Sequence, residues 1–362
     1  MTHHAHRGFP IADIWSKPLL VPRRFAFDTN PGVPAPSYSR DVHPTTAFDV
    51  IGDVHGYADK LERLLSEMGY AKHEGVWSHP HRSAVFIGDL IDRGTQQLAT
   101  VEIVRAMVAG GSARIVMGNH EFNAIAWATR HPDRPDEYLR PRHGTLGEKN
   151  RHQHAGFLDA VGDDSPLHLE LIEWFKTFPL WLDLGSARFV HACWSPAAIA
   201  MLAPRVGPDN TLTDDLLVSS STKHDPDYEA VETLLKGPEI DLPPGFAYLD
   251  KDGIHRERAR YAWWNPDATT YRTAAIIPDN ARAADGTAFT ELPDEPLAEV
   301  PSARYDDDTP LFVGHYWQTG TPTLLHDQVA CVDYSAGKGG SLVAYRFNGE
   351  PVLSASSFVS VD

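Results

Sequence analysis

Three short segments of the sequence each join an apolar run to a glycine and then to a residue that can bind a metal. They are 49–56 (DVIGDVHG), 85–94 (VFIGDLIDRG) and 115–121 (IVMGNHE). Glycine permits a sharp exit from a strand and a close approach of the backbone to a neighbouring group. Mixed carboxylate, amide and imidazole ligands suit first-row divalent metals. One Gly-Asp pair alone also fits an ordinary turn, but three in series indicate a shared metal site.

The elements around these segments are expected to bring the polar residues to one edge of a sheet. Apolar residues recur at helical spacing over 61–68 and over 98–108, so a helix is predicted after each of the first two strands. Strand, helix, strand, helix, strand describes a right-handed βαβαβ unit with a parallel sheet. The carboxyl ends of its strands face one crevice. The polar residues expected there are Asp53, His55, Asp89, Asp92, Asn119 and His120.

In this order, GDVHG, GDLIDRG and GNHE resemble the motifs of the calcineurin-like metallophosphoesterases. Within them they resemble the phosphoprotein phosphatase branch, which includes bacterial dinucleoside tetraphosphate hydrolases. The resemblance is tight over 48–122 and looser beyond, and it implies the α/β fold of that family, an αββα sandwich. The family's later His-Ala and Gly-His elements read here as 191–192 and 314–315. His191 and His315 are therefore implied as the last two metal ligands.

The resemblance also distributes the ligands between two divalent metal ions. One ion would take Asp53, His55 and Asp89; the other would take Asp89, Asn119, His191 and His315, with the Asp89 carboxylate bridging. The mixed nitrogen and oxygen set favours manganese, with iron, zinc or cobalt as alternatives, over an all-oxygen magnesium or calcium site. The implied reaction is hydrolysis of a phosphate monoester by direct attack of a metal-bridging hydroxide, as in serine/threonine phosphatases.

Other motif residues are implied in binding and protonating the substrate. His120 would donate a proton to the leaving group while Asp92 holds its imidazole. Arg93 and Asn119 would bind phosphate oxygens, although an arginine next to Asp92 can also serve stability alone. The family adds a second arginine from the region between the last two histidines. The candidates are Arg258, Arg260 and Arg272, with Arg272 taken as the prediction and Lys338 as a further phosphate contact.

The rest of the chain carries weaker signals. Residues 1–45 are rich in proline and are predicted to be an extension packed on the body. The metallophosphoesterase domain would then span 46–362, with an elaboration at about 200–310. Arginines and histidines in 130–154 indicate either a solvated loop or a loop that grips substrate.

Secondary structure beyond the motifs is predicted from shorter patterns. A helix is expected over 169–178. Strands are expected over 180–184 and 188–194 as a pair, and 329–334 with 342–347 as a closing antiparallel hairpin.

Composition limits the class of partner. The formal charge of −17 at pH 7 argues against a general nucleic-acid-binding surface and against an anionic membrane. The two cysteines, Cys193 and Cys331, lie far apart in apolar stretches, and no apolar segment has the length of a signal peptide or membrane span. A cytoplasmic protein is predicted, and its partner is expected to be a phosphorylated small molecule, nucleotide or phosphoprotein.

Two other functions remain open on the sequence alone. A dinucleoside polyphosphate hydrolase, or a nucleotide or polynucleotide phosphatase, would use the same site. Trp263, Trp264 and Trp317 could stack bases for it, or could equally be core residues. The other alternative is a non-catalytic scaffold on the same fold. A scaffold would tolerate the loss of a ligand, of His120 or of Arg93, whereas all of them are present.

Overall fold

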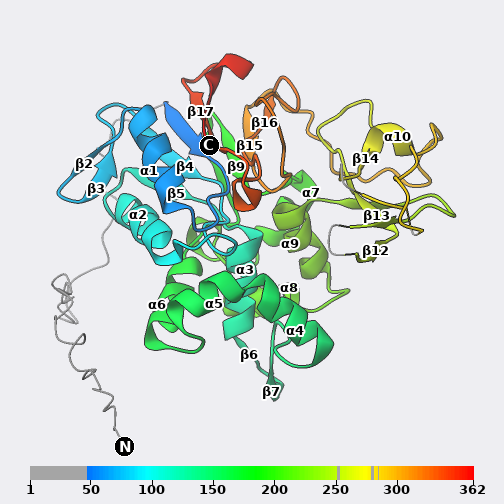
Figure 1. Cartoon of the computed structure of the whole chain (residues 1–362), viewed down its shortest axis with the longest axis horizontal. Coiled ribbons are helices and arrows are strands. Elements are labelled where there is room, and N and C mark those ends of the chain that lie inside the picture. The colour runs from blue at the N-terminus through cyan, green and yellow to red at the C-terminus, as the bar shows by residue number, and fades with distance from the viewer. Residues whose placement is uncertain (1–46, 251–252, 279–280, 284) are drawn as a thin grey trace, which may run out of the picture. The chain divides into compact units, whose positions relative to one another are not determined.

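Two stacked β-sheets carry the residues singled out above (Figure 1). The computed structural model describes residues 47–250, 253–278, 281–283 and 285–362, so the extension predicted at 1–45 lies outside the described residues. The first sheet has the order β18-β17-β1-β4-β5. Its strands are β1 (Phe48–Ile51), β4 (Ser83–Phe86), β5 (Ala113–Ile115), β17 (Leu342–Phe347) and β18 (Phe358–Val361). β4 runs parallel to both β1 and β5, which confirms the predicted parallel arrangement.

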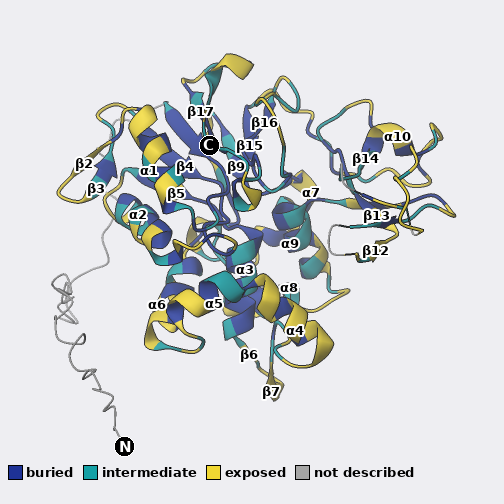
Figure 2. Ribbon diagram, viewed as in Figure 1, coloured by how far each residue is buried: buried dark blue, intermediate teal, exposed yellow. Residues whose placement is uncertain are grey.

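Helices α1 (Ala58–Glu67) and α2 (Gln97–Ala109) connect these parallel strands and pack on the side of the first sheet that faces away from the second (Figure 1). Leu61, Leu64 and Leu65 of α1 are fully buried, as the helical spacing predicts. Figure 2 shows the opposite sides of both helices exposed. A short hairpin lies between α1 and β4, formed by β2 (Ala71–His73) and β3 (Val76–Ser78).

The second sheet has the order β16-β15-β9-β8. Its strands are β8 (Trp181–Asp183), β9 (Arg188–Val190), β15 (Leu311–Val313) and β16 (Val329–Cys331). β8 pairs antiparallel with β9, which confirms the expected pair, and β15 runs parallel to β9 and β16. Aromatic rings fill the space between the sheets: Phe48 lies 5.9 Å from Phe189, and Phe312 lies 5.5 Å from Phe347, centroid to centroid. Burial of each such ring contributes about 1.5–3 kcal/mol.

β16 and β17 do not pair with each other, so the closing hairpin predicted from 329–334 and 342–347 is wrong. β16 is an edge of the second sheet, whereas β17 pairs with β1 and β18 in the first. Both segments are mostly apolar, and such a run does not show which sheet a strand joins. The residues between them instead carry the chain from one sheet to the other through the turn η2 (Ala336–Lys338).

Helices and small sheets surround this sandwich. The region expected to be a loop over 130–154 contains a hairpin and a helix, and the helix expected over 169–178 is α6. The elements are α3 (Asn119–Ala128), β6 (Arg130–His131), β7 (Arg134–Tyr138), α4 (Gly144–Gln153), α5 (Ala155–Val161), α6 (Pro166–Phe175), α7 (Pro196–Leu202), η1 (Pro208–Asn210), α8 (Asp214–Ser220) and α9 (Pro226–Lys236). No helix in the described part of the chain combines the length and apolar character that crossing a membrane requires.

The remaining elements are short strands and one helix between 239 and 276, and a 3-10 helix near the C-terminus. They are β10 (Glu239–Asp241), β11 (Tyr248–Leu249), β12 (His255–Arg256), β13 (Arg258–Tyr261), α10 (Tyr271–Ala274), β14 (Ala275–Ile276) and η3 (Ala355–Ser357). β10, β13 and β14 make a three-stranded antiparallel sheet. The region at about 200–310, which was predicted as an elaboration, contains three α-helices, α8, α9 and α10, and two small sheets among its described residues.

Candidate metal centre

The predicted ligands lie where strands of both sheets end. Asp53 follows β1, Asp89 follows β4, and Asn119 begins α3 after β5. His191 directly follows β9, and His315 lies just after β15. Residues 262 positions apart meet here, since the backbone N–H of His315 donates to Asp53 Oδ2 at 3.3 Å. Both sheets therefore contribute to one group of side chains.

Close backbone packing positions these residues. A Cβ atom on Gly118 would lie 2.2 Å from the backbone nitrogen of Asp89, so no larger residue fits there. His55, Asp89 and His315 have φ angles of 50°, 51° and 67°, a left-handed conformation that costs a non-glycine residue about 1–2 kcal/mol. Such strain collects at functional sites, where the surrounding structure maintains it.

Backbone carbonyls set the ring orientation of two histidines. His55 Nδ1 lies 2.8 Å from Ile91 O, and His191 Nδ1 lies 2.6 Å from Ile87 O. A carbonyl only accepts, so each Nδ1 carries the hydrogen and each Nε2 of a neutral ring presents a lone pair. Both lone pairs face the Asp89 carboxylate, with Nε2 to Oδ2 distances of 3.8 Å from His55 and 3.5 Å from His191. The imidazole lone pairs and the carboxylate oxygen all accept hydrogen bonds, so this arrangement is stable only with a cation or a proton between them.

The other predicted ligands lie in the same group of side chains. Asn119 Oδ1 lies 2.8 Å from His315 Nδ1 and 3.1 Å from His191 Nε2. Asp53 Oδ1 is buried and has no hydrogen-bond partner among the described residues. Burial lowers the pKa of His55 to about 4, so a proton is disfavoured on that ring at neutral pH. The nitrogen and oxygen donor set therefore fits divalent transition metals.

Several buried carboxylates lie close together in this region. Burial, followed by Asp333 and Asp89, raises the pKa of Asp53 well above its usual value. Burial and then Asp89 raise the pKa of Glu121 to about 7. Glu121 was not predicted to have a role of its own, yet it accepts the backbone N–H groups of Asp89 and Leu90 at 2.9 and 2.8 Å. Divalent cations would balance this concentration of negative charge.

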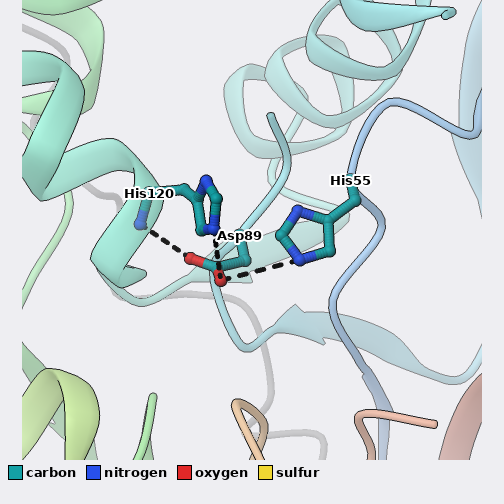
Figure 3. A group of neighbouring side chains, drawn as sticks. All are labelled: His55, Asp89 and His120. Carbon is teal, nitrogen blue, oxygen red and sulfur yellow. Dashed lines mark hydrogen bonds and ion pairs between the residues drawn. The ribbon is translucent and has the colours of Figure 1, made fainter. Parts of the chain in front are cut away.

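His55 and His120 both direct a ring nitrogen at the Asp89 carboxylate, and their ring centroids lie 4.8 Å apart (Figure 3). His120 Nδ1 lies 2.5 Å from Asp92 Oδ2, and its Nε2 lies 3.9 Å from Asp89 Oδ2. Because a carboxylate accepts, Nδ1–H donates to Asp92 and Nε2 faces the centre. Burial opposes protonation, but Asp89 and Asp92 raise the pKa of His120 above its usual value. This geometry allows His120 to exchange a proton with a group bound at the centre.

Asp92 has a second histidine partner that the sequence pattern did not indicate. His154 Nδ1 lies 2.9 and 3.1 Å from the two oxygens of Asp92, across 62 residues of chain. Burial would raise the pKa of Asp92, but His154 and His120 hold it well below its usual value. Nothing distinguishes His154 from the other histidines of 130–154 by spacing, so no sequence signal could have identified it.

The first predicted phosphate ligand, Arg93, lies exposed beside His55. It makes no hydrogen bond or ion pair with another described residue. Asp92 pairs with two histidines instead, so the alternative in which Arg93 serves only to neutralise Asp92 is not supported by a contact.

Among the three arginines considered for the second phosphate contact, Arg260 lies at the centre. Burial and then the charge of Arg260 lower the pKa of His315, and the Nε atom of Arg260 is buried without a hydrogen-bond partner. The Nε of Arg272 donates to Leu292 O at 3.1 Å and lies 3.2 Å from Glu291, on the exposed surface. Arg260 Nη1 also lies 3.5 Å from Glu239, but its Nε has no hydrogen-bond partner among the described residues, whereas the Nε of Arg272 is engaged away from the centre. This difference favours Arg260 over the predicted Arg272. Arg258 is likewise engaged by acidic side chains of β10.

Trp317 and Lys338 lie beside the centre. The Trp317 and His315 rings are 6.0 Å apart. Lys338 Nζ lies 5.3 Å and Arg260 Cζ 6.0 Å from the Trp317 ring centroid. Trp263, by contrast, is buried in the core. Trp317 is thus the tryptophan, among those considered for base stacking, that lies against a predicted ligand.

The curated relatives with sequence similarity include bis(5'-nucleosyl)-tetraphosphatases. The asymmetrical bis(5'-nucleosyl)-tetraphosphatase PrpE of Halalkalibacterium halodurans is 45% identical over 74 residues, which cover 20% of this chain and 30% of that protein. A symmetrical bis(5'-nucleosyl)-tetraphosphatase of Janthinobacterium sp. (strain Marseille) is 32% identical over 168 residues, 44% of this chain and 51% of that protein. The chain thus spans only part of the length of these relatives.

Solved structures of similar architecture include a putative diadenosine tetraphosphatase, with 15% identity and a TM-score of 0.41 over 88% of this chain and 95% of that chain. A protein serine/threonine phosphatase from Saccharomyces cerevisiae has 14% identity and a TM-score of 0.43 over 89% and 80%. Residues 46–242, more than half of the chain and including all three motifs, match the family model described as calcineurin-like phosphoesterase. The mixed α/β fold is the one predicted from the motifs, and the chain belongs to the calcineurin-like phosphoesterase family.

Proposed function

We propose that this chain hydrolyses phosphate esters at a pair of divalent metal ions, with a phosphate monoester as its substrate. One observation carries the proposal: the imidazole lone pairs of His55 and His191 are directed at the Asp89 carboxylate, while backbone carbonyls occupy their other nitrogens. Buried acceptors that face one another are stabilised when cations lie between them.

The ligand set would divide between two ions that share Asp89. Asp53, His55 and Asp89 would hold one ion, and Asp89, Asn119, His191 and His315 the other. Manganese suits this donor set, with iron, zinc and cobalt as alternatives. Two divalent ions bound there supply a nucleophile at neutral pH and balance the charge that develops on the phosphate.

The chain's own residues would bind the phosphate and protonate the leaving group. Arg93 and Arg260 offer planar guanidinium groups, which match pairs of phosphate oxygens. Arg93 has no partner among the described residues, and Arg260 has an unpaired Nε beside His315. His120, held by Asp92, would give a proton to the departing oxygen.

Hydrolysis of a dinucleoside polyphosphate is the second candidate function. Trp317 offers an aromatic ring near the cations of Arg260 and Lys338, next to the predicted ligand His315. Such a platform suits a base attached to a chain of phosphates. Similarity to two bis(5'-nucleosyl)-tetraphosphatases supports the same substrate class.

Metal reconstitution tests the function. Metal-free protein supplied separately with Mn²⁺, Fe²⁺, Zn²⁺ or Co²⁺ is expected to bind about two ions per chain and to cleave p-nitrophenyl phosphate only when loaded. Parallel assays with a phosphopeptide and diadenosine tetraphosphate separate the candidates, because cleavage of the dinucleotide alone would favour the second. A loaded protein that cleaves none of the three would support the scaffold alternative, and one that binds no metal would exclude both hydrolase candidates.

A further inference from the structure

Asp92 accepts hydrogen bonds from two histidines, and the second has no role in the function proposed above. His120 Nδ1 lies 2.5 Å from Oδ2, while His154 Nδ1 lies 2.9 Å from Oδ1 and 3.1 Å from Oδ2. We propose that His154 is a positioning residue, which holds the Asp92 carboxylate so that Asp92 can orient His120 for proton transfer to the leaving group. This inference rests on the proposed hydrolase function.

His154 acts as a hydrogen-bond donor in this contact. Its Nδ1 carries the hydrogen because a carboxylate only accepts. Its Nε2 is buried without a hydrogen-bond partner among the described residues, close to the rings of Phe157 and Trp127. His154 therefore adds a second hydrogen bond to the Asp92 carboxylate, beside the one from His120.

Three separate elements meet in this chain of hydrogen bonds. His154 occupies the break between α4 and α5, Asp92 lies in the loop between β4 and α2, and His120 lies in the first turn of α3. A Cβ atom on Gly156 would lie 3.7 Å from Asp92 Cα, so the start of α5 packs directly on that loop. The backbone N–H of Asp92 donates to Gln97 Oε1 at 2.8 Å. The backbone and the carboxylate of Asp92 thus have independent anchors.

The second anchor matters because a carboxylate with one partner can rotate about its Cβ–Cγ bond, where the torsional preference is broad. Rotation of Asp92 would weaken the bond that keeps the hydrogen on His120 Nδ1. That bond also directs His120 Nε2 towards the centre, 3.9 Å from Asp89 Oδ2. Loss of His154 should therefore affect substrates whose leaving group needs a proton more than substrates whose leaving group departs as a stable anion.

The matched variants His154→Leu and His154→Asn isolate the hydrogen bond. The two new side chains have the same branching, and only asparagine places an N–H group near the position of Nδ1. Full-length, metal-loaded proteins are assayed on phenyl phosphate, a poor leaving group, and on p-nitrophenyl phosphate, a good one. We expect His154→Leu to lower kcat for phenyl phosphate by about 10-fold, with far less effect on p-nitrophenyl phosphate and no change in KM. His154→Asn should restore most of the loss.

Equal losses on the two substrates, or no loss, would overturn the inference. Proton NMR of the imidazole N–H groups gives a readout that does not depend on turnover. The wild-type protein should show two strongly downfield N–H resonances bonded to Asp92, and a missing His154 resonance overturns the inference even if the leucine variant does not fold. A wild-type protein that cleaves neither substrate in any metal would instead defeat the proposed function itself.

Discussion

Two clusters in this protein contain the same residue types but differ in how their charges are balanced. At the metal centre, Asp89 lies among the Nε2 atoms of His55 and His191 and pairs with no described lysine or arginine. A second cluster, Asp163, Asp164 and His168, also brings its possible ligand atoms within 4.8 Å of one another. Residue type and proximity alone would therefore mark both as metal sites.

In the second cluster, arginines balance the charge of the two carboxylates. Arg142 donates to both oxygens of Asp164 at 2.8 and 2.9 Å, and Arg151 donates to Asp163 at 2.9 Å. His168 Nδ1 accepts the backbone N–H of Asp164 at 3.0 Å, so this lone pair is already used. The comparison teaches that buried acceptors without protein donors, rather than acids and histidines as such, are what make a group of side chains suitable for a metal.

Removing one carboxylate from each cluster should give the largest contrast. Asp89→Asn is expected to abolish hydrolysis, because Asp89 would bridge both ions. It should lower metal affinity by more than the roughly 10–100-fold lost with an outer hydrogen-bond partner. Asp164→Asn should leave both properties unchanged. Elemental analysis and turnover of the two variants measure these effects.

The control variant, Asp164→Asn, should itself lower the stability of the protein slightly. Asp164 is 54% exposed, so losing its ion pair should lower the free energy of unfolding by less than about 1 kcal/mol. Loss of bound metal from Asp164→Asn would show that the second cluster also binds ions, and the distinction between the clusters would not hold.

Removing divalent ions with a chelator should lower the free energy of unfolding, because the candidate metal centre loses its ions. The loss should grow as the pH rises above neutral. Without metal, burial and Asp89 raise the pKa of Glu121 to about 7, and Asp89 raises that of His191 against the effect of burial. The folded chain then binds more protons than the unfolded chain, so its stability falls as pH rises through these values. Divalent ions replace the protons and bind more tightly as pH rises.

Denaturant unfolding with and without Mn²⁺ checks this pH dependence. The gap in unfolding free energy should widen between about pH 7 and about pH 8.5, where free histidines are mostly neutral and do not offset it. One saturated site adds about 2.7 kcal/mol when free metal is 100 times its Kd. A gap that stays constant, or narrows, over this range would contradict the assigned ligands.

The smallest expected effect is on KM, and it should distinguish Arg260, which has an unpaired Nε, from Arg272, whose Nε has a hydrogen-bond partner. Arg260→Ala should raise KM about 10-fold, the order expected for one charge-assisted hydrogen bond to phosphate. Arg272→Ala should leave KM unchanged, because its guanidinium is engaged by Leu292 O and Glu291. Arg260→Lys keeps the charge but not the planar fork and should fall between. Michaelis constants for p-nitrophenyl phosphate decide the matter, and equal effects of the two alanine variants would remove Arg260 from the site.

Sequence patterns were most successful where the information is local. Apolar runs followed by Gly-Asp or Gly-Asn predicted strand ends, and the 3.6-residue spacing over 61–68 predicted α1 with its buried face. They failed for β16 and β17, whose sheet is chosen by distant partners, and for 130–154, where α4 formed in a stretch without apolar periodicity. They could not choose among Arg258, Arg260 and Arg272, because distance along the chain does not show on which surface a side chain lies.

By itself the sequence determined which residue types follow the strands, and thus the family, the fold and the set of possible ligands. Only the tertiary structure decided which of these acceptors stay without protein donors. It also decided that His154 meets Asp92 and that Arg260, rather than Arg272, lies beside His315. The physical reason is that hydrogen bonds and charges in a buried site are balanced by side chains from elements far apart in the chain, and no spacing along the sequence records their approach.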